Sequence, residues 1–249
     1  CRRASRCRWM LVAFGLFLAL GSGSPFCGAV STAPRSELPR PAVQSPTYLS
    51  DGDAQRFSDA GYTTRSAVYG TASEKMAQEE LWSALQAMLG PSSVESFLKS
   101  GSFVDLGSGE GELVLTALSL FPDLTKGVGV ELSHERQKEA VRKAQESSPQ
   151  VGSRAEFLQG DICDESNQKI VEAIATARLL FVSNVMFEAK LMDCVSRVLR
   201  RFVATEGKAA VVVAVGKQLD LDGRVTSSQS GLMTGSWGLA PAYVYGILG

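Results

Sequence analysis

FVDLGSGEGELVL, residues 103–115, places three glycines at alternate positions between two short apolar runs. The first run predicts a strand over 103–106 and the second predicts a helix over 112–120, so the glycines occupy the turn between them. Glycine adopts backbone conformations that other residues avoid, and it lets a ligand approach the main chain closely. This stretch therefore predicts a ligand site at the carboxyl end of a strand.

Strands and helices alternate along the rest of the chain. Apolar periodicity predicts helices over 73–89, 134–146, 166–177 and 188–201, and strands over 126–131, 156–159, 178–183 and 209–215. Such alternation predicts an α/β fold whose mostly parallel sheet has helices on both sides. The final segments, 227–237 and 240–248, have no helix between them and predict a C-terminal antiparallel β-hairpin.

The charge of the chain is uneven, although its formal net charge is only −1. Residues 1–40 carry six arginines and one acidic residue, whereas residues 41–249 carry 19 basic and 25 acidic residues. A body with this excess of acidic residues exerts no overall attraction on nucleic acid. Strong nucleic-acid binding by the body is therefore not expected.

Histidine and cysteine are scarce. His134 is the only histidine and no two cysteines form a C-x-x-C pair, so no metal site is predicted. Cys163 and Cys194 are the cysteines that lie beyond residue 27. Composition favours buried free thiols at these two positions, and a disulfide between them stays open as the alternative.

The first 29 residues resemble a targeting signal. A basic segment precedes an apolar run of twelve residues at 9–20, and small residues at 27–29 offer a cleavage site before Val30. A membrane span needs roughly 20 residues, so a cleaved signal peptide is expected, and an uncleaved membrane anchor is the alternative. Residues 30–65 are expected to form a disordered, transit-like linker before a folded domain at 66–249. Such a leader indicates the secretory pathway or an organelle such as a plastid. If the leader is an artefact of gene prediction, the nucleus is the expected location.

The glycine loop lacks the features of the common nucleotide sites. A dinucleotide-binding loop has its third glycine one position later, where this chain has Glu112. A P-loop needs Lys and Ser or Thr after its last glycine, and these are missing. Glu110 and Glu112 would also place carboxylates where a pyrophosphate sits. The pattern favours a cationic or neutral ligand.

Asp-x-Gly-x-Gly-x-Gly after a first strand resembles the S-adenosylmethionine loop of class I methyltransferases. The resemblance implies a Rossmann-like class I methyltransferase sheet and S-adenosyl-L-methionine as the cofactor. It also implies that the carboxylate of Asp105 faces the ammonium group of the cofactor. The loop residues expected beside the cofactor are Gly107, Ser108, Gly109 and Gly111.

Two acidic residues follow the next two strands in the same way. Glu131 ends the strand over 126–131, where a carboxylate can accept hydrogen bonds from both ribose hydroxyls. Asp161 follows the strand over 156–159 and is expected to accept from the adenine amino group, with Ile162 packing on the ring. Either acid alone is typical of a solvated strand end. Together with the glycine loop, they indicate one cofactor site.

Six stretches occur in an order that resembles the non-SET histone-lysine methyltransferases, the disruptor-of-telomeric-silencing family. The resemblance covers roughly residues 66–248. The stretches are VYGTASEKMAQEEL (68–81), FVDLGSGEGELVL (103–115), GVELS (129–133), QGDI (159–162), LFVSNVMF (180–187) and TGSWGLAPAYVY (234–245).

The resemblance implies a lysine substrate and names further site residues. It implies that Tyr69 and Thr71 lie at the cofactor, that Ser183 and Asn184 lie in the catalytic site, and that Trp237 walls the lysine channel. The chain departs from the family pattern in three places, one of which is a channel tyrosine that falls on Val244. Tyr-Gly-Glu-Thr becomes Tyr-Gly-Thr-Ala at 69–72, and the first asparagine of Phe-Val-Asn-Asn becomes Ser183.

Three functions stay open. The first is a protein-lysine methyltransferase that acts on a histone or, since the body is acidic, on another protein. The second is a class I methyltransferase of RNA or of a small molecule. The third is a module that binds S-adenosylmethionine without catalysis, which the changes at Thr71, Ala72 and Ser183 motivate. Contact with a membrane is expected only through an uncleaved leader.

Overall fold

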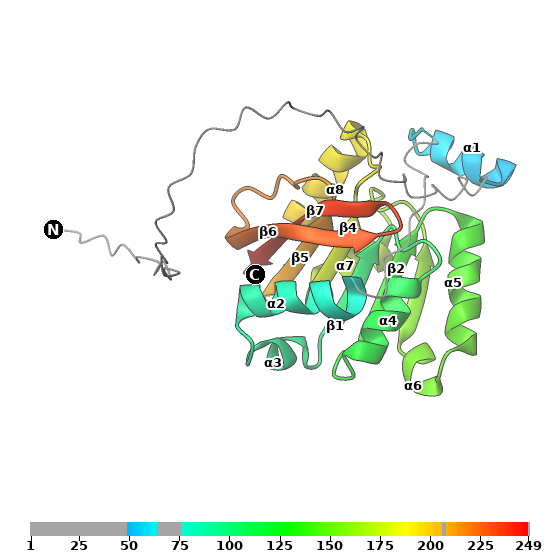
Figure 1. Ribbon diagram of the computed structural model, residues 1–249. Coiled ribbons are helices and arrows are strands. Elements are labelled where there is room, and N and C mark those ends of the chain that lie inside the picture. Colours follow the sequence, from blue (N-terminus) through cyan, green and yellow to red (C-terminus); the bar gives the residue numbers. More distant parts are fainter. Residues whose placement is uncertain (1–48, 64–75, 206–207, 249) are drawn as a thin grey trace, which may run out of the picture. The chain divides into compact units, whose positions relative to one another are not determined.

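The computed structural model describes residues 49–63, 76–205 and 208–248, which contain a seven-stranded sheet with helices on both faces (Figure 1). The strand order is β3-β2-β1-β4-β5-β7-β6. Strands β1 to β5 are parallel, and β7 runs antiparallel to both β5 and β6. This confirms the predicted fold class. The strands are β1 Ser102–Leu106, β2 Lys126–Glu131, β3 Ala155–Gln159, β4 Leu179–Ser183, β5 Ala210–Val215, β6 Val225–Gly235 and β7 Gly238–Ile247.

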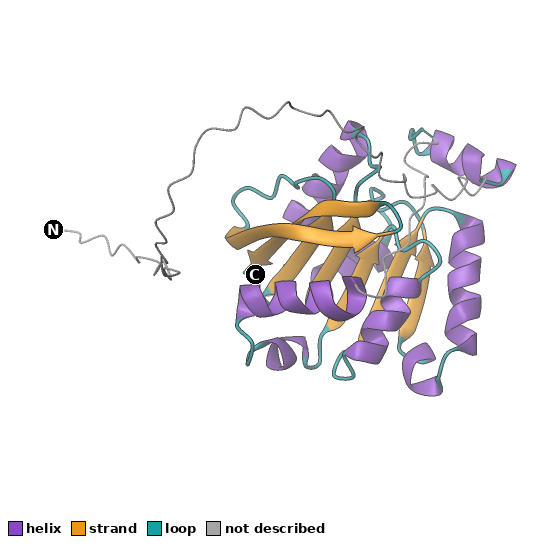
Figure 2. Cartoon of the chain, in the orientation of Figure 1, coloured by secondary structure: helices purple, strands orange, loops and turns teal. Residues whose placement is uncertain are grey.

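The helices cover the sheet in two layers (Figure 2). Buried side chains of α2, α3, α4 and α5 pack on one face, and those of α1, α7 and α8 pack on the other. The helical segments are α1 Asp51–Asp59, η1 Met76–Glu80, α2 Leu81–Leu89, α3 Val94–Leu98, α4 Glu112–Leu120, α5 His134–Glu146, α6 Pro149–Gly152, α7 Gln168–Thr176 and α8 Ala189–Phe202. None of the helices in the described ranges is long and apolar enough to cross a membrane.

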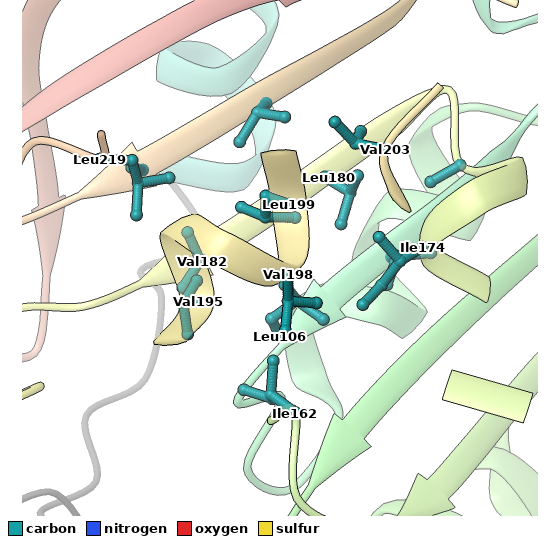
Figure 3. Packing of buried hydrophobic residues seen from close by; sticks show 14 of the residues in the cluster. Leu106, Ile162, Ile174, Leu180, Val182, Val195, Val198, Leu199, Val203 and Leu219 are labelled. Atoms are coloured by element: carbon teal, nitrogen blue, oxygen red, sulfur yellow. The ribbon is translucent and has the colours of Figure 1, made fainter. Parts of the chain in front are cut away.

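The middle strands are buried on both sides, as their sequences predict. All six residues of β5 are buried, because an unbroken apolar run suits a strand that has helices over both faces. On the side of α8, Figure 3 shows Val182 of β4 close to Val195, with Val198 and Leu106 to their right. This packing fixes the carboxyl ends of β1 and β4, from which the candidate site is built.

The predicted helix over 73–89 begins with an irregular turn. Its described part starts with the π-helical segment η1 and continues as α2 to Leu89. Gly90 follows with a φ of 88° and ends the helix, as the Gly-Pro pair predicts.

The structure differs from the predicted linker at residues 49–63. This segment contains α1, whose N-cap Ser50 accepts a hydrogen bond from the backbone N–H of Asp53 at 3.2 Å. Phe57 and Tyr62 are buried in the core cluster beside α8. Two apolar residues in a polar segment give almost no periodic signal, so the sequence alone predicts a linker here. The predicted leader at 1–29 lies outside the described residues.

Candidate active site

The three glycines of the loop all have left-handed backbone conformations, with φ values of 85°, 54° and 78° at Gly107, Gly109 and Gly111. Side chains disfavour this region because the Cβ atom crowds the backbone. A Cβ on Gly111 would also lie 2.5 Å from the ring of Phe157. Glycine is therefore required at Gly111 for the turn into α4 and for the close packing of the loop on β3.

Strand β2 holds this loop in place. The backbone N–H groups of Gly107 and Ser108 both donate to the carbonyl oxygen of Val130, at 2.9 and 3.0 Å. Glu131 then braces the loop with its carboxylate, because Oε2 accepts from the backbone N–H of Gly109 at 2.9 Å. Its Oε1 accepts from the backbone N–H of Ser133 at 2.8 Å. One carboxylate thus links the glycine loop to the start of α5.

Asp105 and Glu131 form a buried acidic pair at the ends of β1 and β2. Asp105 is 4% exposed and Glu131 is 6% exposed. Burial, together with the nearby charge of Glu131, raises the pKa of Asp105 to about 8. Burial also raises the pKa of Glu131, while hydrogen bonds from Ser133 and Gly109 act in the opposite direction. Asp105 is therefore largely protonated at neutral pH, and a cationic group placed beside it would favour its ionisation.

Asp161 lies at the carboxyl end of β3, next to Glu131. The backbone N–H of Gly160 donates to the carbonyl oxygen of Glu131 at 2.9 Å, which joins the two strand ends. The Asp161 carboxylate accepts from the backbone N–H of Cys163 at 2.8 Å and from the hydroxyl of Tyr62 at 3.0 Å. Ile162 is buried among the core residues near Leu106 (Figure 3). The predicted acids thus lie at adjacent strand ends.

Some predicted residues have surroundings that the sequence did not indicate. The Ser108 hydroxyl is buried, has no hydrogen-bond partner among the described residues, and would meet a Cβ on Gly129 at 2.5 Å. Asn184 is fully buried: its Oδ1 accepts from the backbone N–H of Lys217 at 2.6 Å, and its Nδ2 donates to the carbonyl oxygen of Lys217 at 2.9 Å. The Asn184 amide therefore joins the ends of β4 and β5, and Ser183 beside it is half-buried.

Two aromatic residues, Phe187 and Trp237, occupy different parts of the fold. A Cβ on Gly107 would be 3.5 Å from the ring of Phe187, so this ring borders the glycine loop. Trp237 is in the turn between β6 and β7, where its indole covers Gly235 and packs against the core cluster that includes α2. Its buried indole N–H has no hydrogen-bond partner in the part of the chain that the structure describes. Tyr69 and Thr71 lie outside the described residues.

The acidic side chains of the loop have a basic partner. Lys143 of α5 forms ion pairs with Glu110 at 2.6 Å and with Glu112 at 3.0 Å.

The structure describes no group of three or more His, Cys, Asp or Glu residues that could hold a metal ion at 49–63, 76–205 or 208–248.

The cysteines differ from the favoured interpretation as free thiols. Cys163, in the loop after β3, forms a disulfide with Cys194 of α8, and their Cα atoms are 6.0 Å apart. Glu165 of the same loop pairs with Arg197 at 3.3 Å and with Arg201. Composition alone does not reveal that two cysteines 31 positions apart meet in space.

Sequence reasoning missed the contribution of α1. Asp53 is 2% exposed and its carboxylate accepts from the Ser133 hydroxyl at 2.6 Å and from the backbone N–H of His134 at 2.8 Å. Lys190 donates to the carbonyl oxygen of Gly61 at 3.1 Å and lies over the Tyr62 ring. The only sequence signal is a buried-type aromatic pair, Phe57 and Tyr62, in a polar segment.

Solved structures of known enzymes resemble this fold. The O-methyltransferase TomG from Streptomyces achromogenes, which is involved in tomaymycin synthesis and was crystallised with S-adenosylmethionine, is 13% identical, with a TM-score of 0.50 over 80% of this chain and 88% of that one. An RNA methyltransferase from Salinibacter ruber in complex with S-adenosyl-L-homocysteine is 18% identical, with a TM-score of 0.45 over 68% of this chain and 92% of that one. The likeness to TomG concerns the fold alone. A comparison with curated protein sequences gave no match.

A comparison with protein families identifies the relationship that the motifs indicated. The sequence model of the family described as "Histone methylation protein DOT1" matches residues 65–214. The match includes the glycine loop, the acidic strand ends and the β4 segment with Ser183 and Asn184. The chain therefore belongs to the DOT1 histone methylation family and has the fold of the S-adenosylmethionine-dependent methyltransferases.

Proposed function

We propose that this protein binds S-adenosylmethionine at the carboxyl ends of β1, β2 and β3 and transfers its methyl group to a lysine side chain of another protein. One observation carries the proposal: a bare glycine loop is braced by Glu131 directly beside the buried carboxyl of Asp105. Membership of the DOT1 family supports a protein lysine as the acceptor. A histone is one such substrate, and the acidic body of this chain also suits a basic protein of another kind.

The residues present suit this cofactor. The glycine loop has three left-handed residues without side chains, so a ligand could approach its backbone closely at the end of β1. Asp105 would face the ammonium group, and that positive charge would favour the ionised carboxyl. Glu131 would bind the ribose hydroxyls, and Asp161 the adenine amino group, with Ile162 beside the ring. The carboxylates match the donors that this cofactor presents.

Catalysis in this proposal depends on positioning and on the exclusion of water. When bound, S-adenosylmethionine supplies a methyl group on a positively charged sulfur. Phe187, which borders Gly107, provides apolar surface at that point, and Trp237 shields the approach of the lysine side chain. An apolar channel disfavours the ammonium form of the lysine and lowers its pKa, so the neutral amine attacks without a dedicated base.

Ser183 and Asn184, at the end of β4, have different roles in this proposal. Both hydrogen-bonding ends of the Asn184 amide are used by the backbone of Lys217. We therefore assign Asn184 to hold the two loops together, which modifies the direct contact with the amine that the resemblance implied. The hydroxyl of Ser183 is the group at this strand end that can orient the amine by accepting its hydrogen bond.

A small-molecule acceptor is the second candidate, and one observation favours it. The family asparagine at position 183 is a serine, and the Asn184 amide is turned to Lys217. A site that offers the acceptor fewer hydrogen-bonding groups is less specific for a lysine nitrogen.

The test is methyl transfer from labelled S-adenosylmethionine to defined acceptors. The protein is incubated with free histones, with nucleosomes and with a lysate separated into protein, RNA and small-molecule fractions. We expect label in protein, recovered as methyl-lysine after acid hydrolysis and mass spectrometry. Label in the small-molecule or RNA fraction alone would contradict the lysine assignment and leave the methyltransferase assignment standing.

A matched pair of variants controls for contamination. Gly109→Val fills the loop at a left-handed position with a β-branched side chain, so it should abolish transfer. Gly223→Ala has a similar φ of 79°, with nothing within 4 Å of the new Cβ, and lies outside the loop. It should keep the activity of the unaltered protein, and transfer that survives Gly109→Val undiminished would show that transfer does not depend on the loop.

A further inference from the structure

The α1 segment, residues 49–63, contacts Asp161 directly and is connected to Glu131 through Ser133. At one end, the hydroxyl oxygen of Tyr62 lies 3.0 Å from Oδ1 and 3.1 Å from Oδ2 of Asp161. At the other end, Asp53 accepts from the hydroxyl of Ser133, whose backbone N–H donates to Glu131. The same short segment thus reaches the residue proposed for adenine directly and the residue proposed for ribose through one intermediary.

The contact at Asp161 fixes the direction of its carboxylate. A carboxylate on a loop can rotate about its side-chain bonds, and the direction of its free lone pairs decides which donor it can accept. Here one partner is the backbone N–H of Cys163 and the other is the Tyr62 hydroxyl. Burial and the neighbouring Asp161 carboxylate raise the pKa of Tyr62, so the hydroxyl keeps its proton and remains a donor. Lone pairs that these donors leave free point in a defined direction.

The contact at Asp53 fixes the start of α5. Asp53 accepts from the Ser133 hydroxyl at 2.6 Å and from the backbone N–H groups of His134 and Glu135 at 2.8 and 3.4 Å. These are groups in the first turn of a helix, where a negative charge is stabilised. Ser133 is thereby held where its own backbone N–H meets Oε1 of Glu131 at 2.8 Å.

The segment itself is anchored independently of these two contacts. Phe57 and Tyr62 are buried in the core cluster beside α8. Lys190 of α8 donates to the carbonyl oxygens of Gly61 and Ala60, at 3.1 and 3.5 Å, and Thr63 contacts Glu188. A segment held in this way can transmit a fixed geometry to the loops that it touches.

We propose that Asp53 and Tyr62 are positioning residues of the cofactor site: Tyr62 orients Asp161 toward the adenine amino group, and Asp53 acts through Ser133 to orient Glu131 toward the ribose. The inference rests on the proposed binding of S-adenosylmethionine at this edge of the sheet. It adds residues that precede the family match at 65–214 to the determinants of cofactor recognition.

Three ligands separate orientation from general stability. They are S-adenosylhomocysteine, its analogue without the adenine amino group, and its analogue without the ribose 2′-hydroxyl. Each is titrated by calorimetry into the full chain and into the variants Tyr62→Phe and Asp53→Asn. Tyr62→Phe keeps the buried ring and removes the hydroxyl, and Asp53→Asn keeps the shape and removes the charge. Asp51→Asn, an exposed acid on the same helix, is the matched control.

The expected losses are specific to the ligand. Tyr62→Phe should weaken the binding of S-adenosylhomocysteine about threefold to tenfold, the scale of one hydrogen bond. It should change the affinity for the analogue without the amino group by less than about twofold. Asp53→Asn should weaken the binding of S-adenosylhomocysteine by a similar factor. It should change the affinity for the 2′-deoxy analogue by less than about twofold. Asp51→Asn should change none of the affinities. A purely structural role would weaken all three ligands equally in each variant.

The outcomes distinguish this inference from the function beneath it. If the unaltered protein does not bind S-adenosylhomocysteine, the proposed function fails and the inference fails with it. If it binds, and each variant loses the same factor for every ligand, the positioning role is wrong while the cofactor site stands. Should Tyr62→Phe lose its cooperative melting, Lys190→Met tests the same point, because it loosens the segment without altering Tyr62 or Asp161. An adenine-specific loss supports the proposal, and a uniform loss overturns it.

Discussion

The hydroxyl of Tyr62 lies within hydrogen-bond distance of both carboxylate oxygens of Asp161, at 3.0 and 3.1 Å, although the two residues are 99 positions apart. This contact joins a segment before the family match to the loop that follows β3. The folded domain therefore begins earlier than the motifs indicate, and its first helix forms part of the candidate site.

The need for glycine at position 111 gives a stability prediction. Gly111 and Gly223 have φ values of 78° and 79°, but a Cβ on Gly111 would lie 2.5 Å from Phe157 whereas a Cβ on Gly223 meets nothing within 4 Å. Gly223→Ala should cost about 1–2 kcal/mol from backbone strain alone. Gly111→Ala should cost about 1–3 kcal/mol more because it overpacks the core. Urea unfolding of both variants measures the difference, and equal losses would contradict the packing account.

The raised pKa of Asp105 predicts proton release when the cofactor binds. With a pKa of about 8, Asp105 is mostly protonated at pH 7 before binding. A cationic ammonium group beside it should drive that proton off, and Asp105→Asn should abolish the release. Calorimetry in buffers with different ionisation enthalpies measures the number of protons. Binding without proton release in the unaltered protein would show that Asp105 does not face the ammonium group.

The same shift predicts how stability varies with pH in the absence of ligand. Between the ordinary pKa of 3.8 and about 8, the unfolded chain has lost the Asp105 proton while the folded chain keeps it. The stability that the protonated group contributes at low pH is therefore lost as the pH rises through this window. Asp105→Asn should remove the part of the decline in the free energy of unfolding that comes from this group.

Asn184 and Ser183 should respond differently to truncation. Asn184→Ala removes two buried hydrogen bonds to the Lys217 backbone, so it should lower the free energy of unfolding by about 2–4 kcal/mol. Ser183→Ala should change stability by less than about 0.5 kcal/mol and lower the turnover of the lysine substrate. Thermal melting and methyl transfer on the two neighbours separate the roles. A stable Asn184→Ala protein with lost turnover would restore the direct contact that the family resemblance implied.

Trp237 is expected to act on the substrate rather than on the cofactor. Trp237→Ala should leave the affinity for S-adenosylhomocysteine within about twofold and cut turnover about 100-fold, the scale of a mispositioned reacting group. Trp82→Ala is the matched control, because Trp82 is also half-buried and packs against the same core cluster. Its ring stacks on that of Phe121, with 5.5 Å between the ring centroids. It should lower stability and leave the turnover of the folded protein unchanged. If the two variants behave alike, the Trp237 ring is a packing residue.

The fold and the glycine loop were predictable because their signals are local. The run at 103–115 specifies a strand, a turn with three glycines and a helix within a few residues, and the structure has α4 at the predicted 112–120. Ser133, directly before the helix expected over 134–146, caps α5, and its hydroxyl accepts from the backbone N–H of Arg136 at 3.2 Å. Such caps depend on neighbours in the sequence, so a single chain reveals them.

The contacts between distant segments were not predictable. Three such pairs, Tyr62 and Asp161, Asn184 and Lys217, and Cys163 and Cys194, meet only because the fold brings distant segments together. Asp53 shows the limit most clearly, since an acid in a polar segment is usually exposed. It is buried here because the first turn of α5 supplies its hydrogen bonds.

The most direct test of the account is calorimetric titration of the full chain with S-adenosylhomocysteine and, separately, with NAD. We predict micromolar binding of S-adenosylhomocysteine and no binding of NAD, because the loop lacks the third glycine of dinucleotide sites and carries carboxylates at the pyrophosphate position. Glu131→Gln should weaken S-adenosylhomocysteine by roughly 1–3 kcal/mol through lost charge-assisted hydrogen bonds, in a protein whose cooperative melting is retained. Tight binding of NAD with no binding of S-adenosylhomocysteine would contradict the assignment of the site.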